Sequence, residues 1–142
     1  HFNTEKSHVI PALILKIHQA KIDGEDEVSL WGTGTPLREF LHVDDLASAI
    51  EFLLLNYDEP QTINIGSGHE VSIQDLARLI ADVVGFSGML VNDSSKPDGT
   101  PRKMLDSPRL HKLGWSPVWD LRAGIVDAYR WFVDNESSLR AV

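Results

Sequence analysis

Apolar residues recur along this chain at helical spacing in some stretches and in short strand-like runs in others. Helical spacing predicts helices over His8 to about Lys21, Leu46 to Tyr57, Ile73 to Val84, Arg109 to Leu113 and Leu121 to Phe132. Short apolar runs predict strands at 28–31, 38–43, 62–65 and 89–91. Because these elements alternate without a continuous β–α–β series, we expect a single α/β domain over residues 1–142, a small lobe of helices with short strands.

Capping residues mark the ends of several of these helices. Ser72 opens a Ser-Ile-Gln-Asp run, the pattern of a capping box, directly before the third helix. Asp44 or Asp45 is expected to cap the second helix and Asp120 the last one, since a short carboxylate accepts from the free N–H groups of the first turn. Gly24 is expected to end the first helix.

The stretch 30–46 concentrates the candidate chemistry. Two glycines and a proline follow the first strand and predict a bend before the second. Trp31 and Arg38 stand on either side of this bend, and an indole beside a planar guanidinium suits a flat ring joined to a phosphate. The alternative is structural, with Trp31 packed in the core and Arg38 paired on the surface with Glu39 or Asp45.

The charge balance restricts the class of ligand. Thirteen Lys and Arg residues against 21 Asp and Glu give a formal net charge of −8, which argues against general binding to nucleic acids or anionic membranes. Residues 96–112 depart from this balance, with five basic and two acidic residues, a local charge of 5 − 2 = +3. The polar loop 94–103 within this segment has no packing role to explain its charges, so a functional role is better supported there than elsewhere. The five basic residues are Lys96, Arg102, Lys103, Arg109 and Lys112.

Other residue types exclude several kinds of site. The chain has no cysteine, and its six histidines show no metal-binding spacing, so neither a thiolate nucleophile nor a metal site is predicted. No apolar run approaches the length of a membrane span, and we expect a cytoplasmic protein that binds no membrane. The chain starts at His1 in sequence typical of the middle of a protein, so we expect it to be a piece of a longer chain.

Five segments carry a resemblance to a known family. In order along the chain they are SHVIPALI, LWGTGTPLREFLHVDDLA, INIGSG, VSIQDLA and SKPDGTPRKMLD. Together they resemble the C-terminal half of the extended short-chain dehydrogenase/reductases, the NAD-dependent epimerase/dehydratase family. The second and fourth segments are similar to many nucleotide-sugar epimerases and dehydratases, whereas the first and last resemble the members that epimerise and reduce a GDP-4-keto-6-deoxy sugar.

The resemblance implies roles for individual residues. His8 matches the family's acid/base histidine near the nicotinamide end of the cofactor, so it is implied to be catalytic and to contact NADP. A lone histidine at a helix start is otherwise solvated, and Lys16 by itself reads as solvent-facing. The positions that line the GDP-sugar site in the family are matched by Lys16, Trp31, Arg38, Asp98 and Lys103. The intact enzyme is implied to be a homodimer.

Other parts of the family's active site are missing from this chain. The family binds NADP mainly through an N-terminal Rossmann domain, whereas the Gly-Ser-Gly at 66–68 is a lone G-x-G. Neither Tyr57 nor Tyr129 begins the family's Tyr-x-x-x-Lys motif, and the cysteine that shares epimerisation is absent. We therefore expect this chain to be inactive by itself. The alternatives are another nucleotide-sugar epimerase or dehydratase of the same family, or a non-catalytic module that binds a nucleotide sugar.

Overall fold

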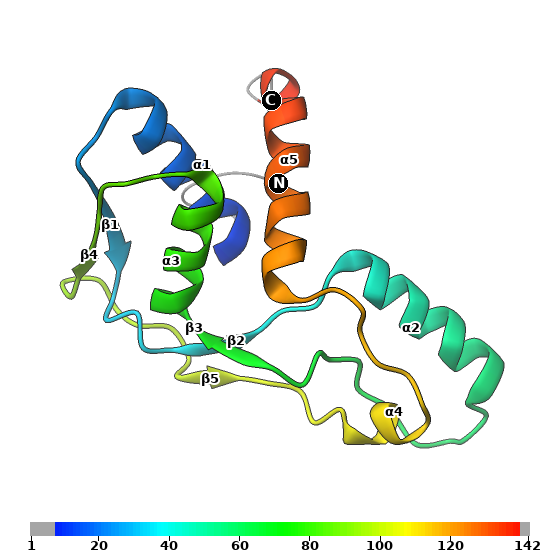
Figure 1. Cartoon of the computed structure of the whole chain (residues 1–142). Helices are drawn as coiled ribbons and strands as arrows, with labels where there is room; N and C mark the ends of the chain where they lie inside the picture. Colours follow the sequence, from blue (N-terminus) through cyan, green and yellow to red (C-terminus); the bar gives the residue numbers. More distant parts are fainter. Residues whose placement is uncertain (1–7, 140–142) are drawn as a thin grey trace.

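Three helices form the centre of the computed structural model, which describes residues 8–139 (Figure 1). Helix α3 (Ile73–Val84) packs against both α1 (Val9–Asp23) and α5 (Leu121–Leu139). Each helix turns its apolar stripe towards the others, which removes those side chains from water. The fully buried side chains of this core include Ile14, Ile17, Leu76, Ile80, Ile125 and Phe132.

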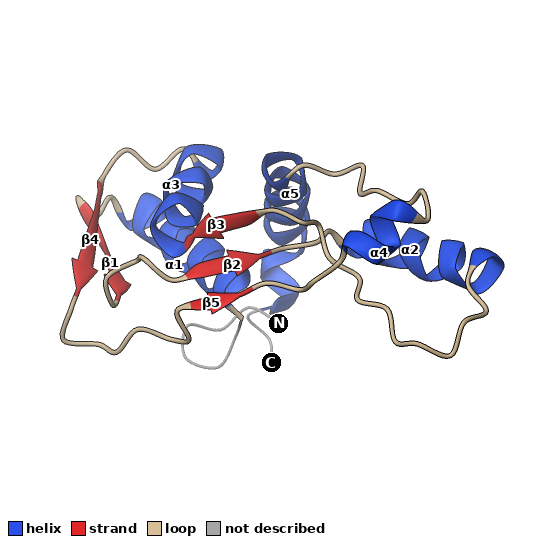
Figure 2. Cartoon of the chain, turned by 90° about the horizontal axis from the view of Figure 1, so that it is seen from below, coloured by secondary structure: helices blue, strands red, loops and turns tan. Residues whose placement is uncertain are grey.

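Two small sheets flank these helices (Figure 2). Strands β1 (Glu27–Trp31) and β4 (Met89–Asp93) form a parallel pair. In the second sheet, β2 (Leu37–Glu39) lies between antiparallel β3 (Glu70–Ser72) and parallel β5 (Arg102–Lys103). The predicted α/β class of helices with short strands is confirmed. We call the three helices and these two sheets the main lobe.

A second group of elements extends to one side of the main lobe (Figures 1 and 2). This arm consists of α2 (Val43–Asn56), α4 (Pro108–Lys112) and the segments 57–69 and 113–119 beside them. Its buried centre is small, comprising Ala49, Leu110 and Trp115. Much of the apolar stripe of α2 faces outwards instead, and its exposed members are Val43, Leu46, Ile50, Leu54 and Leu55.

The predicted helix ends are largely confirmed. Gly24 caps α1 in the left-handed conformation, with φ of 69°. The Ser72 hydroxyl accepts from the Asp75 backbone N–H at 3.0 Å. The Asp120 carboxylate accepts from the Ala123 N–H at 2.7 Å, at the start of α5.

The prediction that Asp44 or Asp45 caps α2 is wrong. The helix begins one residue after His42, whose Nδ1 accepts from the Asp44 backbone N–H at 3.3 Å. Asp45 is buried, and its two oxygens accept from the N–H groups of Val118 and Trp119 at 3.0 and 3.1 Å. The carboxylate that local sequence predicts as a helix cap thus accepts hydrogen bonds from a distant segment instead.

Two strand predictions are also wrong. The second predicted strand ends at Glu39 rather than 43, because its partner β3 is only three residues long and pairs Glu39 with Glu70. Residues 62–65 form no strand, since no strand of the described residues lies alongside them. Their contacts come from side chains instead, such as Asn64 Nδ2, which donates to the Asp106 carbonyl at 2.9 Å.

Candidate functional site

Two connections run side by side from one parallel strand pair to the other. Trp31 at the end of β1 is in register with Asp93 at the end of β4, so both chains leave this pair at the same edge. The connection 32–36 then leads to β2, and the connection 94–101 leads to β5, where the strands are again parallel neighbours. Figure 2 shows both connections bridging the two sheets. Residues about 65 positions apart in sequence therefore lie together along this edge.

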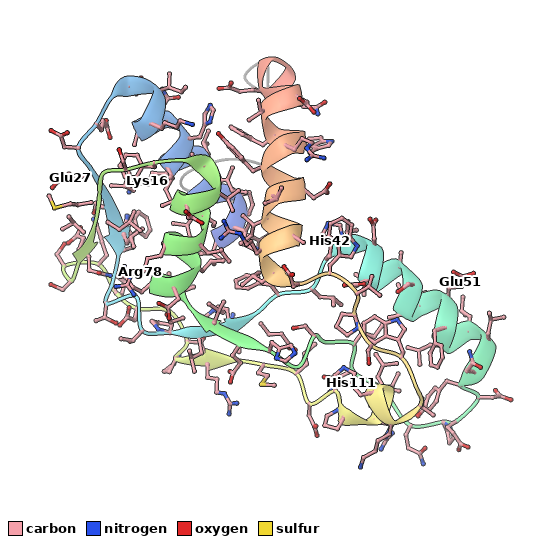
Figure 3. The ribbon with its side chains drawn as sticks, in the orientation of Figure 1. Lys16, Glu27, His42, Glu51, Arg78 and His111 are labelled. Atoms are coloured by element: carbon pink, nitrogen blue, oxygen red, sulfur yellow. The ribbon has the colours of Figure 1, made fainter. Side chains whose placement is uncertain are left out.

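The end of this edge at β1 and β4 holds an exposed indole and two lysines. Trp31 is 60% exposed, and Lys96 Nζ lies 5.8 Å from the centre of its ring, a cation–π distance. Lys16 extends from α1 and donates to the Ser29 carbonyl on β1 (Figure 3). The pKa of Asp93 is lowered, first by hydrogen bonds from the Ser95 hydroxyl and N–H and then by the charges of Lys96 and Lys16.

The other end holds two cations on neighbouring strands. Arg38 on β2 is in register with Lys103 on β5, and side chains in register on parallel strands leave the sheet on the same face. Arg38 is half-buried and donates to the Leu37 carbonyl at 2.7 Å. Among residues 8–139, neither Arg38 nor Lys103 forms an ion pair. This unneutralised pair of positive charges suits an anion with more than one oxygen.

Asp98 joins the two connections between these ends. Its Oδ1 accepts from the Thr33 backbone N–H at 2.8 Å, and its Oδ2 accepts from the Thr33 hydroxyl at 2.8 Å. The next residue, Gly99, passes so close to Arg38 that an added Cβ would lie 3.0 Å from a guanidinium nitrogen. The loop backbone is therefore held against the arginine.

The structural alternative for Trp31 and Arg38 is wrong. Trp31 is exposed rather than packed in the core. Glu39 does not pair with Arg38, because its carboxylate accepts from the backbone N–H groups of Gly68 at 2.7 Å and Leu105 at 2.9 Å. Asp45 is likewise occupied by backbone groups in the arm.

The structure thus brings five of the six predicted site residues to one edge, namely Lys16, Trp31, Arg38, Asp98 and Lys103. The local +3 charge of residues 96–112 divides between two places, because Lys96 and Lys103 lie at this edge whereas Arg109 lies on α4 in the arm. Sequence reasoning did not single out Lys96 or Thr33. The position of Lys96 in the cationic loop could have indicated that it belongs to the site, whereas no local pattern indicates this for Thr33.

His8 lies apart from this edge, at the residue that precedes α1. It is exposed, and its carbonyl accepts from the Ala12 N–H at 3.1 Å. Two residues later, Ile10 lines a hollow of about 710 Å³ between the start of α1, the segment 40–43 that follows β2, strand β3, and α5. The walls of the hollow are mostly apolar and include Phe40, Trp119 and Trp131. Trp131, on α5, is 51% exposed and lines this hollow.

The Gly-x-Gly turns at 32–34 and 66–68 are not of the kind that binds the pyrophosphate of NADP. A turn of that kind leads from a strand through glycines into a helix N-terminus. Gly32 and Gly34 follow β1, but the chain then enters β2, and Gly66 and Gly68 lead into β3. In the described part of the chain, no group of three or more His, Asp or Glu side chains is placed to hold a metal ion. None of its helices is both long enough and apolar enough to cross a bilayer.

Known proteins similar to this chain agree in family. Residues 1–66 match the NAD dependent epimerase/dehydratase family. A probable GDP-L-fucose synthase 1 of Oryza sativa subsp. japonica is 54% identical over 139 residues, which are 98% of this chain and 42% of the relative. A GDP-L-fucose synthase of Escherichia coli (strain K12) is 46% identical in an alignment that covers 98% of this chain and 46% of the relative.

Solved structures give the same result for the fold. A GDP-L-fucose synthetase from Naegleria fowleri bound to NADP superimposes with a TM-score of 0.89 at 30% identity, over 96% of this chain and 43% of that one. The chain thus spans less than half the length of each of these relatives. Sequence and fold agree over nearly all of its residues, and the chain belongs to the NAD dependent epimerase/dehydratase family.

Proposed function

We propose that this chain is the C-terminal, GDP-sugar-binding part of a GDP-L-fucose synthase. The intact enzyme would epimerise GDP-4-keto-6-deoxy-D-mannose and reduce it with NADPH to GDP-L-fucose. Support comes from relatives of that name, among them three that are 46–55% identical to this chain. A protein such as this would act in the cytoplasm as a homodimer, and residues 1–142 would form one substrate-binding domain.

One observation supports placing the GDP-sugar at this site. Arg38 and Lys103 leave one sheet face side by side, without an ion pair among the described residues, and the other end of the same edge carries an exposed indole. Two adjacent cations match the two charged groups of a diphosphate, and a guanidinium forms forked hydrogen bonds to phosphate oxygens. Trp31 offers an apolar face to a flat base or a sugar ring. Lys16 and Asp98 would complete the site with a third cation and an acceptor for ribose or base donors.

The proposed role of His8 is proton transfer. Epimerisation at a carbon beside a keto group requires a base that removes a proton and an acid that returns one from the opposite face. His8 is placed before the first turn of α1, next to the hollow lined by Ile10, and an imidazole exchanges protons near neutral pH. The partner acid/base and the reducing residues would belong to an N-terminal domain outside this chain, which would also hold most of NADP.

That N-terminal domain also gives a reason for the exposed face of α2. Leu54 and Leu55 are 81% and 77% exposed, which leaves a large apolar surface in water. We expect the N-terminal domain to cover this face in the intact enzyme. The chain expressed without that domain is expected to self-associate.

Replacing Arg38 tests the proposed site in the intact enzyme. Arg38→Ala removes a charged hydrogen-bond donor to phosphate, a contact worth about 1.5–3 kcal/mol, so the Kd for GDP should rise by about 10- to 150-fold. Isothermal titration with GDP measures this change. Arg109→Ala is the matched control, since it removes one arginine from the arm, and it should leave the Kd unchanged.

The same titration distinguishes the proposed function from that of another nucleotide-sugar enzyme of the family. Preference for GDP over UDP or dTDP is expected for a GDP-L-fucose synthase. Preference for UDP or dTDP would assign the chain to another nucleotide-sugar enzyme of the family. An unchanged affinity of Arg38→Ala for GDP would contradict the placement of the diphosphate.

A further inference from the structure

The contact between Thr33 and Asp98 ties the two connections of the site together. Both oxygens of the Asp98 carboxylate accept hydrogen bonds from Thr33, one from its N–H at 2.8 Å and the other from its hydroxyl at 2.8 Å. An ionised carboxylate only accepts, so the Thr33 hydroxyl donates its proton to Asp98. The same hydroxyl lies 2.7 Å from the Thr35 hydroxyl and accepts from the Thr35 N–H at 3.2 Å. The single proton of the Thr33 hydroxyl is already donated to Asp98, so the Thr35 hydroxyl is the donor in the contact between the two threonines.

Gly32 is required for this contact to form. A Cβ added at Gly32 would lie 2.2 Å from Asp98 Oδ1, far inside the van der Waals distance. The residue also has φ of 74°, a backbone conformation that favours glycine. Its N–H donates to the Asp93 carbonyl at 3.0 Å, and its own carbonyl accepts from Asn92 Nδ2 at 3.2 Å. The turn is thus anchored to β4 on one side and to Asp98 on the other.

The position of this contact sets the geometry of the cationic edge. Thr33 lies between Trp31 and Arg38 in sequence, and Asp98 lies between Lys96 and Lys103. Lys96 lies over the ring of Trp31. Arg38 and Lys103 lie side by side on adjacent strands. A fixed Thr33–Asp98 contact therefore keeps a constant distance between Trp31 at one end of the edge and the two cations on β2 and β5 at the other.

We propose that Thr33 is a positioning residue of the nucleotide-sugar site. It acts through Asp98, holding loop 94–101 so that Lys96 and Lys103 keep their places beside Trp31 and Arg38. This inference rests on the proposed function, because the ligand it concerns is the GDP-sugar. The role is distinct from ligand contact, since the threonine hydroxyl is fully occupied by Asp98 and Thr35.

Thr33→Val tests this role in the intact enzyme, because valine keeps the shape and the backbone N–H but lacks the hydroxyl. Loss of one charge-assisted hydrogen bond frees the loop, and we expect the Kd for GDP and the KM for the GDP-sugar to rise about three- to tenfold with kcat little changed. Thr33→Ser restores the hydroxyl and should restore both constants. Thr62→Val is the matched control in the arm and should change neither constant.

Trypsin cleavage after Arg102 or Lys103 gives a readout that does not depend on the ligand. Cleavage should be faster in Thr33→Val than in the parent enzyme, and also in Gly32→Ala, where the added Cβ opens the contact. Gly24→Ala is the control for a glycine of similar φ with nothing within 4 Å of the added Cβ, and its cleavage rate should not change.

The outcomes separate this inference from the proposed function. Faster cleavage together with weaker GDP binding supports the positioning role. Unchanged GDP binding in Thr33→Val overturns it, whether or not cleavage is faster. Failure of the parent enzyme to bind GDP overturns the proposed function and the positioning role with it, while the cleavage rates still decide whether the contact fastens the loop.

Discussion

The main lobe and the arm use apolar helices in opposite ways. In the main lobe, α3 turns Leu76 and Ile80 into a core where both are fully buried. In the arm, α2 has apolar residues at the same helical spacing, yet Leu54 is 81% exposed. The spacing therefore shows that a helix has an apolar face, but it does not show that this chain covers that face. An uncovered face of this kind is typical of a contact surface.

The candidate site belongs to the main lobe, which has the larger core. Trp31 stands on β1, which packs against α1, and Arg38 stands on β2, whose neighbour β3 packs against α3. A site on such a supported edge keeps its geometry better than one on free loops. The arm contributes exposed apolar surface instead. Under the proposed function, the main lobe would bind the ligand and the arm would contact another part of the protein.

The largest expected effect compares a buried residue of the main lobe with an exposed one of the arm. Phe132→Ala leaves a cavity among α1, α3 and α5, and we expect the free energy of unfolding to fall by about 3–5 kcal/mol. Leu54→Ala should change it by less than about 0.5 kcal/mol, because its side chain is already in water. Urea unfolding followed by tryptophan fluorescence measures both. Equal losses would mean that α2 is covered within this chain.

A smaller effect is expected from the buried carboxylate that holds the arm together. Asp45→Ala removes the acceptor of the Val118 and Trp119 N–H groups, and leaving them unsatisfied should cost about 1–3 kcal/mol. Asp58→Ala is the control, since that aspartate is exposed near the end of α2. The same urea titration applies. A loss no greater than that of the control would show that the arm does not depend on this contact.

The smallest effect concerns an ion pair on the second sheet. Glu70 on β3 accepts from two nitrogens of Arg102 on β5, each at 2.7 Å, across the intervening β2. The hydrogen bond from Arg102 is the main cause that lowers the pKa of Glu70 below its ordinary value of 4.5. A carboxyl group whose pKa is lower in the folded state stabilises the fold above its unfolded pKa, and this stabilisation is lost as pH falls through the folded pKa.

Glu70→Gln should therefore melt slightly below the parent protein at neutral pH, and the difference in Tm should shrink as pH falls below about 4. Thermal unfolding at a series of pH values measures this. A difference in Tm that stays constant down to pH 3 would show that the charge of Glu70 is not what stabilises the sheet.

Several features of the fold were predictable because their causes are local. Gly24 and Ser72 mark helix ends through contacts within a few residues, and both predictions hold. The bend between Trp31 and Arg38 follows from adjacent glycines and a proline. The second strand, by contrast, could not be bounded from its own residues, because its length depends on the length of β3.

The amino-acid sequence by itself determined which helices form, where several of them are capped and which residue types are available to bind a ligand, because propensity and capping act over a few neighbouring positions. Tertiary structure alone decided that Trp31 is exposed, that Asp45 serves the arm and that Asp98 meets Thr33 across 65 positions of sequence. Those outcomes depend on which distant segments lie side by side. That is a property of the packed chain, and no local pattern encodes it.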